Sequence, residues 1–259
     1  MVTFWQVNIC LICLIFSDVY ATETIRVATA SNFLSPLKNL KIQYETESGQ
    51  ILHISSGSTS KLYAQIINGA PYDIFLSADQ STVGKLIKNN EAIANTEFIY
   101  AIGKLVLWSA KKKRSVLLLQ NDFKNRRFRH LAIANPKLAP YGRAAIEVMK
   151  NLELYDTLHP RLVYGENIGQ TFQFVYSGNA ELGLVALSQL KQLNEVGSYW
   201  EIPLDLYRPI NQSAVILSRA NDNVAAKSFM RFLKSPKIQH ELSRQYGYLS
   251  ATVPTALER

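Results

Sequence analysis

The sequence contains few of the side chains that bind metals or act as nucleophiles. Among 259 residues there are two cysteines and four histidines. Both cysteines, Cys10 and Cys13, lie in the first 21 residues, so their C-x-x-C spacing predicts neither a redox nor a metal site in the rest of the chain. The scattered histidines have no H-x-x-x-H or H-E-x-x-H spacing, and such isolated residues are more often structural than ligating. They are His53, His130, His159 and His240.

Motifs of common enzymes are also absent. The sequence has no G-x-S-x-G elbow, no G-x-x-x-x-G-K-[ST] loop and no G-x-G-x-x-G fingerprint. The segment 57–61 (GSTSK) is the nearest to a phosphate loop, but it lacks the paired glycines and the lysine spacing. Asp73 and Asp79 are interpreted as turn or cap residues rather than as an acid and base pair. We therefore predict a protein that is not an enzyme.

Acidic residues are outnumbered, with 20 Asp and Glu against 28 Lys and Arg, which gives a formal net charge of +8. This excess favours the approach of an anionic ligand by long-range steering. Two basic runs, Lys111–Arg114 (KKKR) and Lys124–His130 (KNRRFRH), raise the question of nucleic acid. Neither places aromatic residues on a stacking platform, and such runs are usually solvated faces, so we do not expect nucleic-acid binding.

The first 21 residues are predicted to be a secretory signal peptide. Residues 7–16 are apolar except for Asn8, and Val19 and Ala21 form a small-x-small pattern before a cut at Thr22. The run is too short to span a bilayer comfortably, and its start carries no Lys or Arg. Removing the segment also removes Asp18, which raises the net charge by one, from +8 to +9. The alternative to a signal peptide is a buried terminal strand or helix. The sequence also does not decide whether the mature protein is free or tethered to a membrane.

After this segment, apolar residues alternate between strand and helix periods. Such alternation predicts an α/β fold with mostly parallel sheets covered by helices. Gly49, Gly69 and Gly247 are placed where helices should end. The predicted strands are 24–30, 51–55, 73–76, 102–108, 131–134, 162–164, 182–185 and 213–218. The predicted helices are 33–44, 62–67, 80–90, 143–152, 170–177 and 224–242.

This order predicts two lobes, the second inserted in the first. Lobe 1 comprises 22–103 and 214–259, and lobe 2 comprises 104–213. The chain then crosses between the lobes twice, near Lys104 and Ser213, and two crossings make a hinge.

Four segments pass from a strand into a helix through a loop of small and polar residues. They are Ile25–Phe33, Ile51–Leu62, Leu131–Gly142 and Leu162–Phe172. A helix that begins in this way leaves backbone N–H groups free at its start, and ligands of parallel sheets bind at the carboxyl ends of the strands. Four such loops around one cleft would bind an anion without any charged side chain.

Six motifs occur in order and at fitting spacings. They are ASNFLSPL from Ala30, SSGSTSKLYAQI from Ser55, GAPYDIFLSADQ from Gly69, NPKLAPYG from Asn135, GENIGQTFQFV from Gly165 and GNAELGLVALS from Gly178. Together they resemble the periplasmic molybdate-binding proteins of molybdate ABC transporters, from about Ile25 to about Tyr248.

The resemblance implies a two-lobe, type II periplasmic binding protein that closes on one tetrahedral oxyanion. It also implies delivery of molybdate, and of tungstate, to a membrane permease of an ABC transporter. We expect a periplasmic monomer without a cofactor and without metal ligands of its own.

The resemblance places oxyanion-binding residues in each of the four loops. They are Ser31, Asn32, Ser58, Thr59, Tyr141 and Ile168. One departure concerns the tyrosine that some members carry after the G-x-V strand, which is Ala186 here. In members with the APYG form, Tyr141 is expected to supply that hydroxyl instead.

The chemistry of molybdate fits such a set. Molybdate is a fully deprotonated dianion at neutral pH, so it accepts hydrogen bonds, whereas hydrogen phosphate also needs an acceptor for its proton. Sulfate or another oxyanion on the same fold is the first alternative, and an enzyme or sensor domain is the second. Each of Ser31, Thr59 and Tyr141, taken alone, is equally consistent with a cap or turn role.

Overall fold

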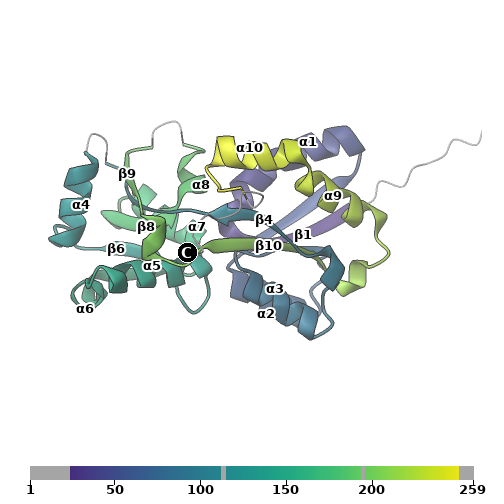
Figure 1. Ribbon diagram of the computed structural model, residues 1–259, viewed down its shortest axis with the longest axis horizontal. Helices are drawn as coiled ribbons and strands as arrows, with labels where there is room; N and C mark the ends of the chain where they lie inside the picture. Colours follow the sequence, from purple (N-terminus) through teal and green to yellow (C-terminus); the bar gives the residue numbers. More distant parts are fainter. Residues whose placement is uncertain (1–23, 112–114, 194–195, 251–259) are drawn as a thin grey trace, which may run out of the picture.

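Two five-stranded sheets lie side by side in the molecule, and helices cover both faces of each (Figure 1). The computed structural model describes residues 24–111, 115–193 and 196–250. The predicted signal peptide and both cysteines lie outside these residues. Within the described ranges, no helix is long and apolar enough to cross a membrane.

The first sheet has the strand order β2-β1-β3-β10-β4. In this sheet β1 pairs in parallel with β2 and β3, whereas β10 pairs antiparallel with β3 and β4. Its strands are β1 (Thr24–Ala30), β2 (Ile51–Gly57), β3 (Ile74–Leu76), β4 (Phe98–Gly103) and β10 (Ile210–Ile216).

The second sheet has the order β7-β6-β8-β5-β9. Here β6 pairs in parallel with β7 and β8, and β5 pairs antiparallel with β8 and β9. Its strands are β5 (Leu105–Ser109), β6 (Leu131–Ala134), β7 (Leu162–Gly165), β8 (Leu182–Ala186) and β9 (Ser198–Glu201).

The α/β class predicted from the alternation is confirmed, although both sheets are mixed rather than mostly parallel. Each sheet is mixed because one of its strands runs opposite to the others. This strand starts at the boundary between the sheets and runs away from it. These strands are β10 and β5, and they oppose neighbours that run toward the boundary. The carboxyl ends of β1, β2 and β3 therefore face those of β6, β7 and β8.

Helices α1, α9 and α10 lie on one side of the first sheet, and α2 and α3 lie on the other (Figure 1). The second sheet is covered by α4, α5 and α6 on one side and by α7 and α8 on the other. The helices are α1 (Leu34–Ser48), α2 (Thr59–Ile67), α3 (Gln80–Lys88), α4 (Val116–Lys124), α5 (Pro140–Asn151), α6 (Tyr155–Leu158), α7 (Ile168–Tyr176), α8 (Leu187–Leu190), α9 (Val224–Lys234) and α10 (Pro236–Tyr246). Short 3-10 helices are η1 (Ser31–Phe33), η2 (Ala94–Thr96), η3 (His159–Arg161), η4 (Leu204–Leu206) and η5 (Ser218–Ala220).

The apolar strands are buried on both faces because successive side chains point to opposite sides. On β1, Val27 packs with α1 and α9, whereas its neighbour Ala28 packs with α2 and α3. On β5, Leu107 packs on the side of α4, α5 and α6, whereas its neighbour Trp108 packs on the side of α7 and α8. Each sheet therefore has two apolar cores of its own.

Glycines end two helices where the sequence predicted, whereas a proline starts a helix that the sequence did not predict. Gly49 and Gly247 follow α1 and α10 with φ of 70° and 72°, a left-handed conformation that glycine adopts without a Cβ clash. The long helix predicted over 224–242 is wrong in one respect, since it breaks into α9 and α10 at Ser235-Pro236. Pro236 has no N–H and disfavours a helical residue before it, so it occupies the first position of a new helix.

The predicted strand 102–108 is in fact two strands in different sheets. β4 ends at Gly103 and β5 begins at Leu105, which leaves Lys104 alone between them. The chain returns to the first sheet with β10, which begins at Ile210, so the domain boundary placed after residue 213 falls inside this strand. The residue bounds of the two lobes remain a proposal that rests on these sheets.

Candidate functional site

A pocket lies between the two sheets, where the carboxyl ends of their parallel strands face each other. Its empty volume is about 190 Å³. Ser31, Asn32, Ser58, Thr59, Tyr141 and Ile168, all predicted from the sequence, line this one pocket. The sequence did not predict five further lining residues, which are Ala30, Gly57, Ala78, Ala139 and Pro140. Among the described residues of the lining, none has a charged side chain.

Ser31 and Asn32 enter the pocket from η1, directly after β1. The Ser31 Oγ accepts a hydrogen bond from the backbone N–H of Gly169, at 3.2 Å. Asn32 is 1% exposed, and its Nδ2 donates to Gln212 Oε1 at 2.7 Å and to the Tyr248 hydroxyl at 3.2 Å. Its Oδ1 has no hydrogen-bond partner in the described part of the chain, so the amide is held by its Nδ2 end.

Ser58 and Thr59 form the start of α2. Ser58 is the N-cap residue, but its side chain makes no capping bond. Its hydroxyl is buried without a hydrogen-bond partner among the described residues, which is uncommon because burying an unpaired hydroxyl costs free energy. The Thr59 Oγ1 accepts from the backbone N–H of Ala78, at 3.3 Å. Both hydroxyl groups therefore retain a proton that no described residue receives.

Tyr141 lies in the first turn of α5, which Pro140 starts at a position where no N–H is needed. The ring is 1% exposed, and its hydroxyl oxygen accepts from Gln212 Nε2 at 3.3 Å. Burial, with a smaller effect of Tyr248, raises the pKa of Tyr141 well above its usual value. The hydroxyl thus stays protonated and can donate. Ala186, in contrast, is buried in the core of the second sheet and does not line the pocket.

Three helices of nine to twelve residues, α2, α5 and α7, begin at the pocket. Ile168 is the first residue of α7, and the side chain of Asn167 caps this helix through the N–H of Gln170 at 3.0 Å. The first N–H groups of a helix have no partner within it, and each helix start carries roughly half a positive charge. Three helix starts can therefore balance an anion in a pocket without Arg or Lys.

The two halves of the molecule touch around this pocket. The N–H of Ser60 donates to the carbonyl of Leu138 at 3.1 Å, and the Ser188 hydroxyl donates to the carbonyl of Asn32 at 3.1 Å. Together with the bond between Gly169 and Ser31, these contacts join the first sheet's loops to those of the second. The structure is therefore a closed arrangement of the two sheets.

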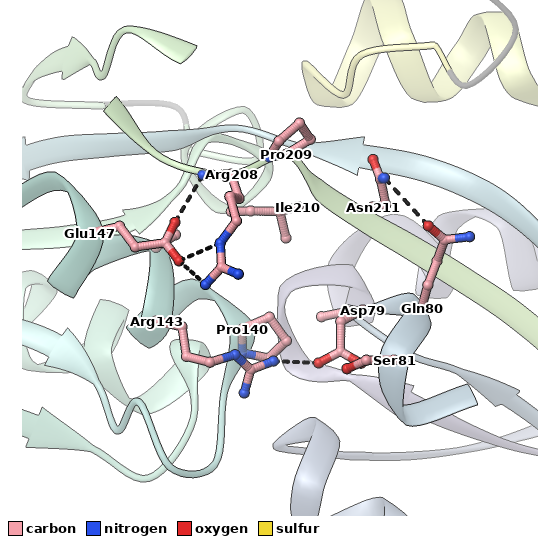
Figure 2. A pocket seen from close by; sticks show the side chains of 12 residues that line it. Asp79, Gln80, Ser81, Pro140, Arg143, Glu147, Arg208, Pro209, Ile210 and Asn211 are labelled. Carbon is pink, nitrogen blue, oxygen red and sulfur yellow. Dashed lines mark hydrogen bonds and ion pairs between the residues drawn. The ribbon is translucent and has the colours of Figure 1, made fainter. Parts of the chain in front are cut away.

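A larger cavity, with about 660 Å³ of empty volume, lies beside the pocket and shares Ala78 and Pro140 with it (Figure 2). Arg143 of α5 forms an ion pair there with Asp79, at the start of α3, so this pair joins the two halves. Arg208 forms a second ion pair, with Glu147 of α5. Burial alone would raise the pKa of Glu147, but the hydrogen bonds from Arg208 lower it below its usual value. Both arginines of this cavity are therefore paired with carboxylates of the chain itself.

The two aspartates considered as an acid and base pair have structural roles. Asp79 caps α3 by accepting from the N–H of Thr82 at 2.8 Å. Asp73 accepts from the N–H of Arg26 at 2.7 Å and from the Arg219 guanidinium at 2.9 Å. Across the described ranges, no group of three or more His, Cys, Asp or Glu side chains could hold a metal ion.

A family model described as bacterial extracellular solute-binding protein matches residues 25–249 of the chain. The molybdate-binding protein ModA of Azotobacter vinelandii is 46% identical over 230 residues, which cover 86% of this chain and 89% of that protein. The molybdate-binding protein ModA of Rhodobacter capsulatus is 42% identical over 233 residues, which cover 89% of this chain and 90% of that protein.

Solved structures have the same architecture. The periplasmic molybdate-binding protein of Azotobacter vinelandii matches with a TM-score of 0.81 and 40% identity, over 89% of this chain and 99% of that chain. The substrate-binding domain of a molybdenum ABC transporter protein from Clostridium difficile matches with a TM-score of 0.65. At 24% identity, this second likeness concerns the fold alone. The two-lobe α/β architecture predicted from the sequence is thus confirmed.

Proposed function

Since the chain belongs to the bacterial extracellular solute-binding proteins, we propose that it captures molybdate between its two lobes and delivers it to the permease of an ABC transporter. The two relatives that support this proposal are molybdate-binding proteins, and this chain matches each of them over most of its length. The family resemblance drawn from the six motifs is confirmed by the same relatives.

One observation carries the proposal most directly, which is the make-up of the pocket. Hydroxyl groups of Ser31, Ser58, Thr59 and Tyr141 line it together with the starts of α2, α5 and α7. The unpartnered, buried hydroxyl of Ser58 is the sharpest feature, because a ligand oxygen would relieve the cost of its burial. These groups suit a small, fully deprotonated oxyanion that accepts hydrogen bonds from every side.

The proposed capture is a closure of the two lobes. Molybdate would lie between loops of both sheets, so it stabilises the closed arrangement by its higher affinity for that state. The net positive charge of the chain assists the encounter. The six lining residues predicted from the sequence are proposed to be the ligand-binding residues, and Lys104 is proposed to lie at the hinge.

A thermal melt with different oxyanions tests the function. At molybdate concentrations one hundred times the dissociation constant, the free energy of unfolding should rise by about 2.7 kcal/mol. For a protein of this size the melting temperature should then rise by roughly 5 to 10 °C. Sulfate and phosphate at equal concentrations should give smaller shifts. A sulfate shift without a molybdate shift would reject the assignment in favour of the sulfate alternative.

Five finer properties belong to the same proposal. The chain is exported through residues 1–21, acts in the periplasm as a monomer, accepts tungstate as well as molybdate, and catalyses no reaction. The extracellular family supports the location, and the similar size and charge of the two oxyanions support the shared pocket. Isothermal titration calorimetry with tungstate and N-terminal sequencing of the exported protein test two of these points directly.

A further inference from the structure

Gln212 is fully buried in β10, the strand that returns the chain to the first sheet. The pairing of β10 with β4 is irregular between Gln212 and Ser213. Bulges of this kind re-aim a side chain that regular pairing would direct elsewhere. The Gln212 side chain lies outside the pocket lining, yet it contacts two of the residues that form it.

The two ends of the Gln212 amide are bonded to different parts of the molecule. Its Oε1 accepts from Asn32 Nδ2 at 2.7 Å and from the Tyr100 hydroxyl at 2.9 Å, and both donors belong to the first sheet and its loops. Its Nε2 donates to the hydroxyl oxygen of Tyr141, which belongs to the other half of the molecule. The first two bonds fix the amide so that an N–H group faces Tyr141.

This direction matters for the Tyr141 hydroxyl, which has a single proton to donate. Because Gln212 donates to the tyrosine oxygen, the tyrosine proton is not used in that bond. No described residue accepts it either. An acceptor in place of the Gln212 N–H would instead take the proton and remove it from the pocket.

The chain leaves space for this contact at the end of β4. A Cβ atom on Gly103 would overlap the Tyr141 hydroxyl and would lie 2.9 Å from Gln212 Nε2. Glycine is therefore needed at this position for the tyrosine to reach the amide. In a buried network of this kind, hydrogen bonds are stronger than in water and hold one arrangement.

Resting on the proposed function, we propose that Gln212 is a positioning residue that directs the O–H of Tyr141 toward the bound oxyanion. Asn32 and Tyr100 hold its amide ready within the first lobe, and Tyr141 meets it from the second. Gln212 thus acts on molybdate through Tyr141 and not by direct contact.

A double-mutant cycle tests this role, with Gln212→Met and Tyr141→Phe made alone and together. Molybdate dissociation constants are measured by titration calorimetry at pH 8. Gln212→Met should weaken binding by about tenfold or more in the presence of Tyr141, the range for hydrogen bonds to charged groups. In the Tyr141→Phe background the same change should weaken binding by less than about threefold. An equal effect in both backgrounds would overturn the proposal.

Two further proteins separate this role from a merely structural one. Gln65→Met removes an exposed glutamine that accepts from the Tyr72 hydroxyl at 3.0 Å, and it should leave the dissociation constant unchanged.

If Gln212→Met does not fold, Gln212→Glu replaces it in the cycle, because Glu keeps the acceptor for Asn32 and replaces the donor that faces Tyr141. The molybdate affinity of Gln212→Glu should fall as the pH rises from 6 to 9. The fall should be smaller when Gln212→Glu is combined with Tyr141→Phe. Wild-type protein without affinity for molybdate would reject the proposed function itself, whereas binding with an additive cycle would reject only the role of Gln212.

Discussion

The backbone N–H of Gly169 donates to the Oγ of Ser31 at 3.2 Å, and this bond joins the start of α7 to the loop that follows β1. One hydroxyl group thus forms one of the contacts between the two halves of the molecule at the pocket. Because its oxygen accepts from Gly169, its proton is left for a ligand. In the proposed function, closure and ligand binding would therefore depend on the same atom.

Ser31→Ala should weaken molybdate binding by about tenfold or more, since it removes a hydrogen bond to a charged ligand and a closing contact. The melting temperature without ligand should change little, because Ser31 is only partly buried. Ser177→Ala is a suitable control, since that hydroxyl donates to the carbonyl of Gln173 at the far end of α7. Titration calorimetry measures both, and an unchanged affinity in Ser31→Ala would contradict its role as a ligand.

Ser58→Ala should separate stability from binding. The Ser58 hydroxyl is buried without a partner in the described residues, so its removal should leave the ligand-free melting temperature unchanged or slightly higher. Molybdate affinity should nevertheless fall by about tenfold or more. Ser115→Ala should do the reverse, since that side chain caps α4 by accepting from the N–H of Leu118 at 3.2 Å. If Ser58→Ala instead lowered the ligand-free melting temperature and kept full molybdate affinity, Ser58 would be a helix cap and not a ligand-binding residue.

Arg143→Met and Arg208→Met form a matched pair in the cavity of Figure 2. Both remove one positive charge, but only the ion pair of Arg143 with Asp79 joins the two halves. Arg143→Met should weaken molybdate binding by up to about fivefold, the range for partly exposed ion pairs, because the closed state loses a contact. Arg208→Met should have a smaller effect. Equal losses would mean that the two arginines act through long-range attraction and not through closure.

Stability should fall at alkaline pH because of the buried tyrosines. Burial raises the pKa of Tyr100 and Tyr141 well above the usual value, whereas an unfolded chain releases these protons near pH 10. The stabilisation is therefore complete below about pH 10 and is lost as the pH rises toward the folded-state pKa. For each such tyrosine, the free energy of unfolding should fall by up to about 1.4 kcal/mol per pH unit. Urea unfolding between pH 9 and 11 should give a shallower decline for Tyr141→Phe, and an identical decline would contradict the burial argument.

Much of the fold could be predicted because local signals and tertiary structure agree. The strands around Val27 and Ile133 are short apolar runs, and Gly49 ends its helix at the predicted place. The split at Lys104 could not be seen, because 102–108 is one alternating apolar run and only the two sheets decide where it divides. The strand β9 and helix α4 were missed. The exposed Leu117 and Leu118 weaken the helical pattern of α4.

The site followed from a different kind of signal. Small and polar residues after each strand predicted where helices begin, and the family resemblance indicated which residues of these loops would bind the anion. The closed arrangement brings Ser31, Thr59 and Tyr141 around one pocket. Pro140 and Ala78 also line it, and although both lie in motifs of the family resemblance, neither was predicted as a site residue, because their side chains cannot donate a hydrogen bond. Gln212 was also missed. A single glutamine inside an apolar strand has no motif, and its partners Asn32 and Tyr141 are far away in sequence.

The lengths of the two crossings also differ. Lys104 is the single residue between β4 and β5, whereas residues 202–209 separate β9 from β10. In the proposed closure, a link of one residue would fix one point of the rotation axis, because it leaves only a few torsion angles to turn. Atoms near this point travel the shortest arcs when the halves move apart. The Tyr141 hydroxyl lies against Gly103. In the proposed closure it would therefore be close to the pivot, and contacts farther along the boundary would sweep through longer arcs.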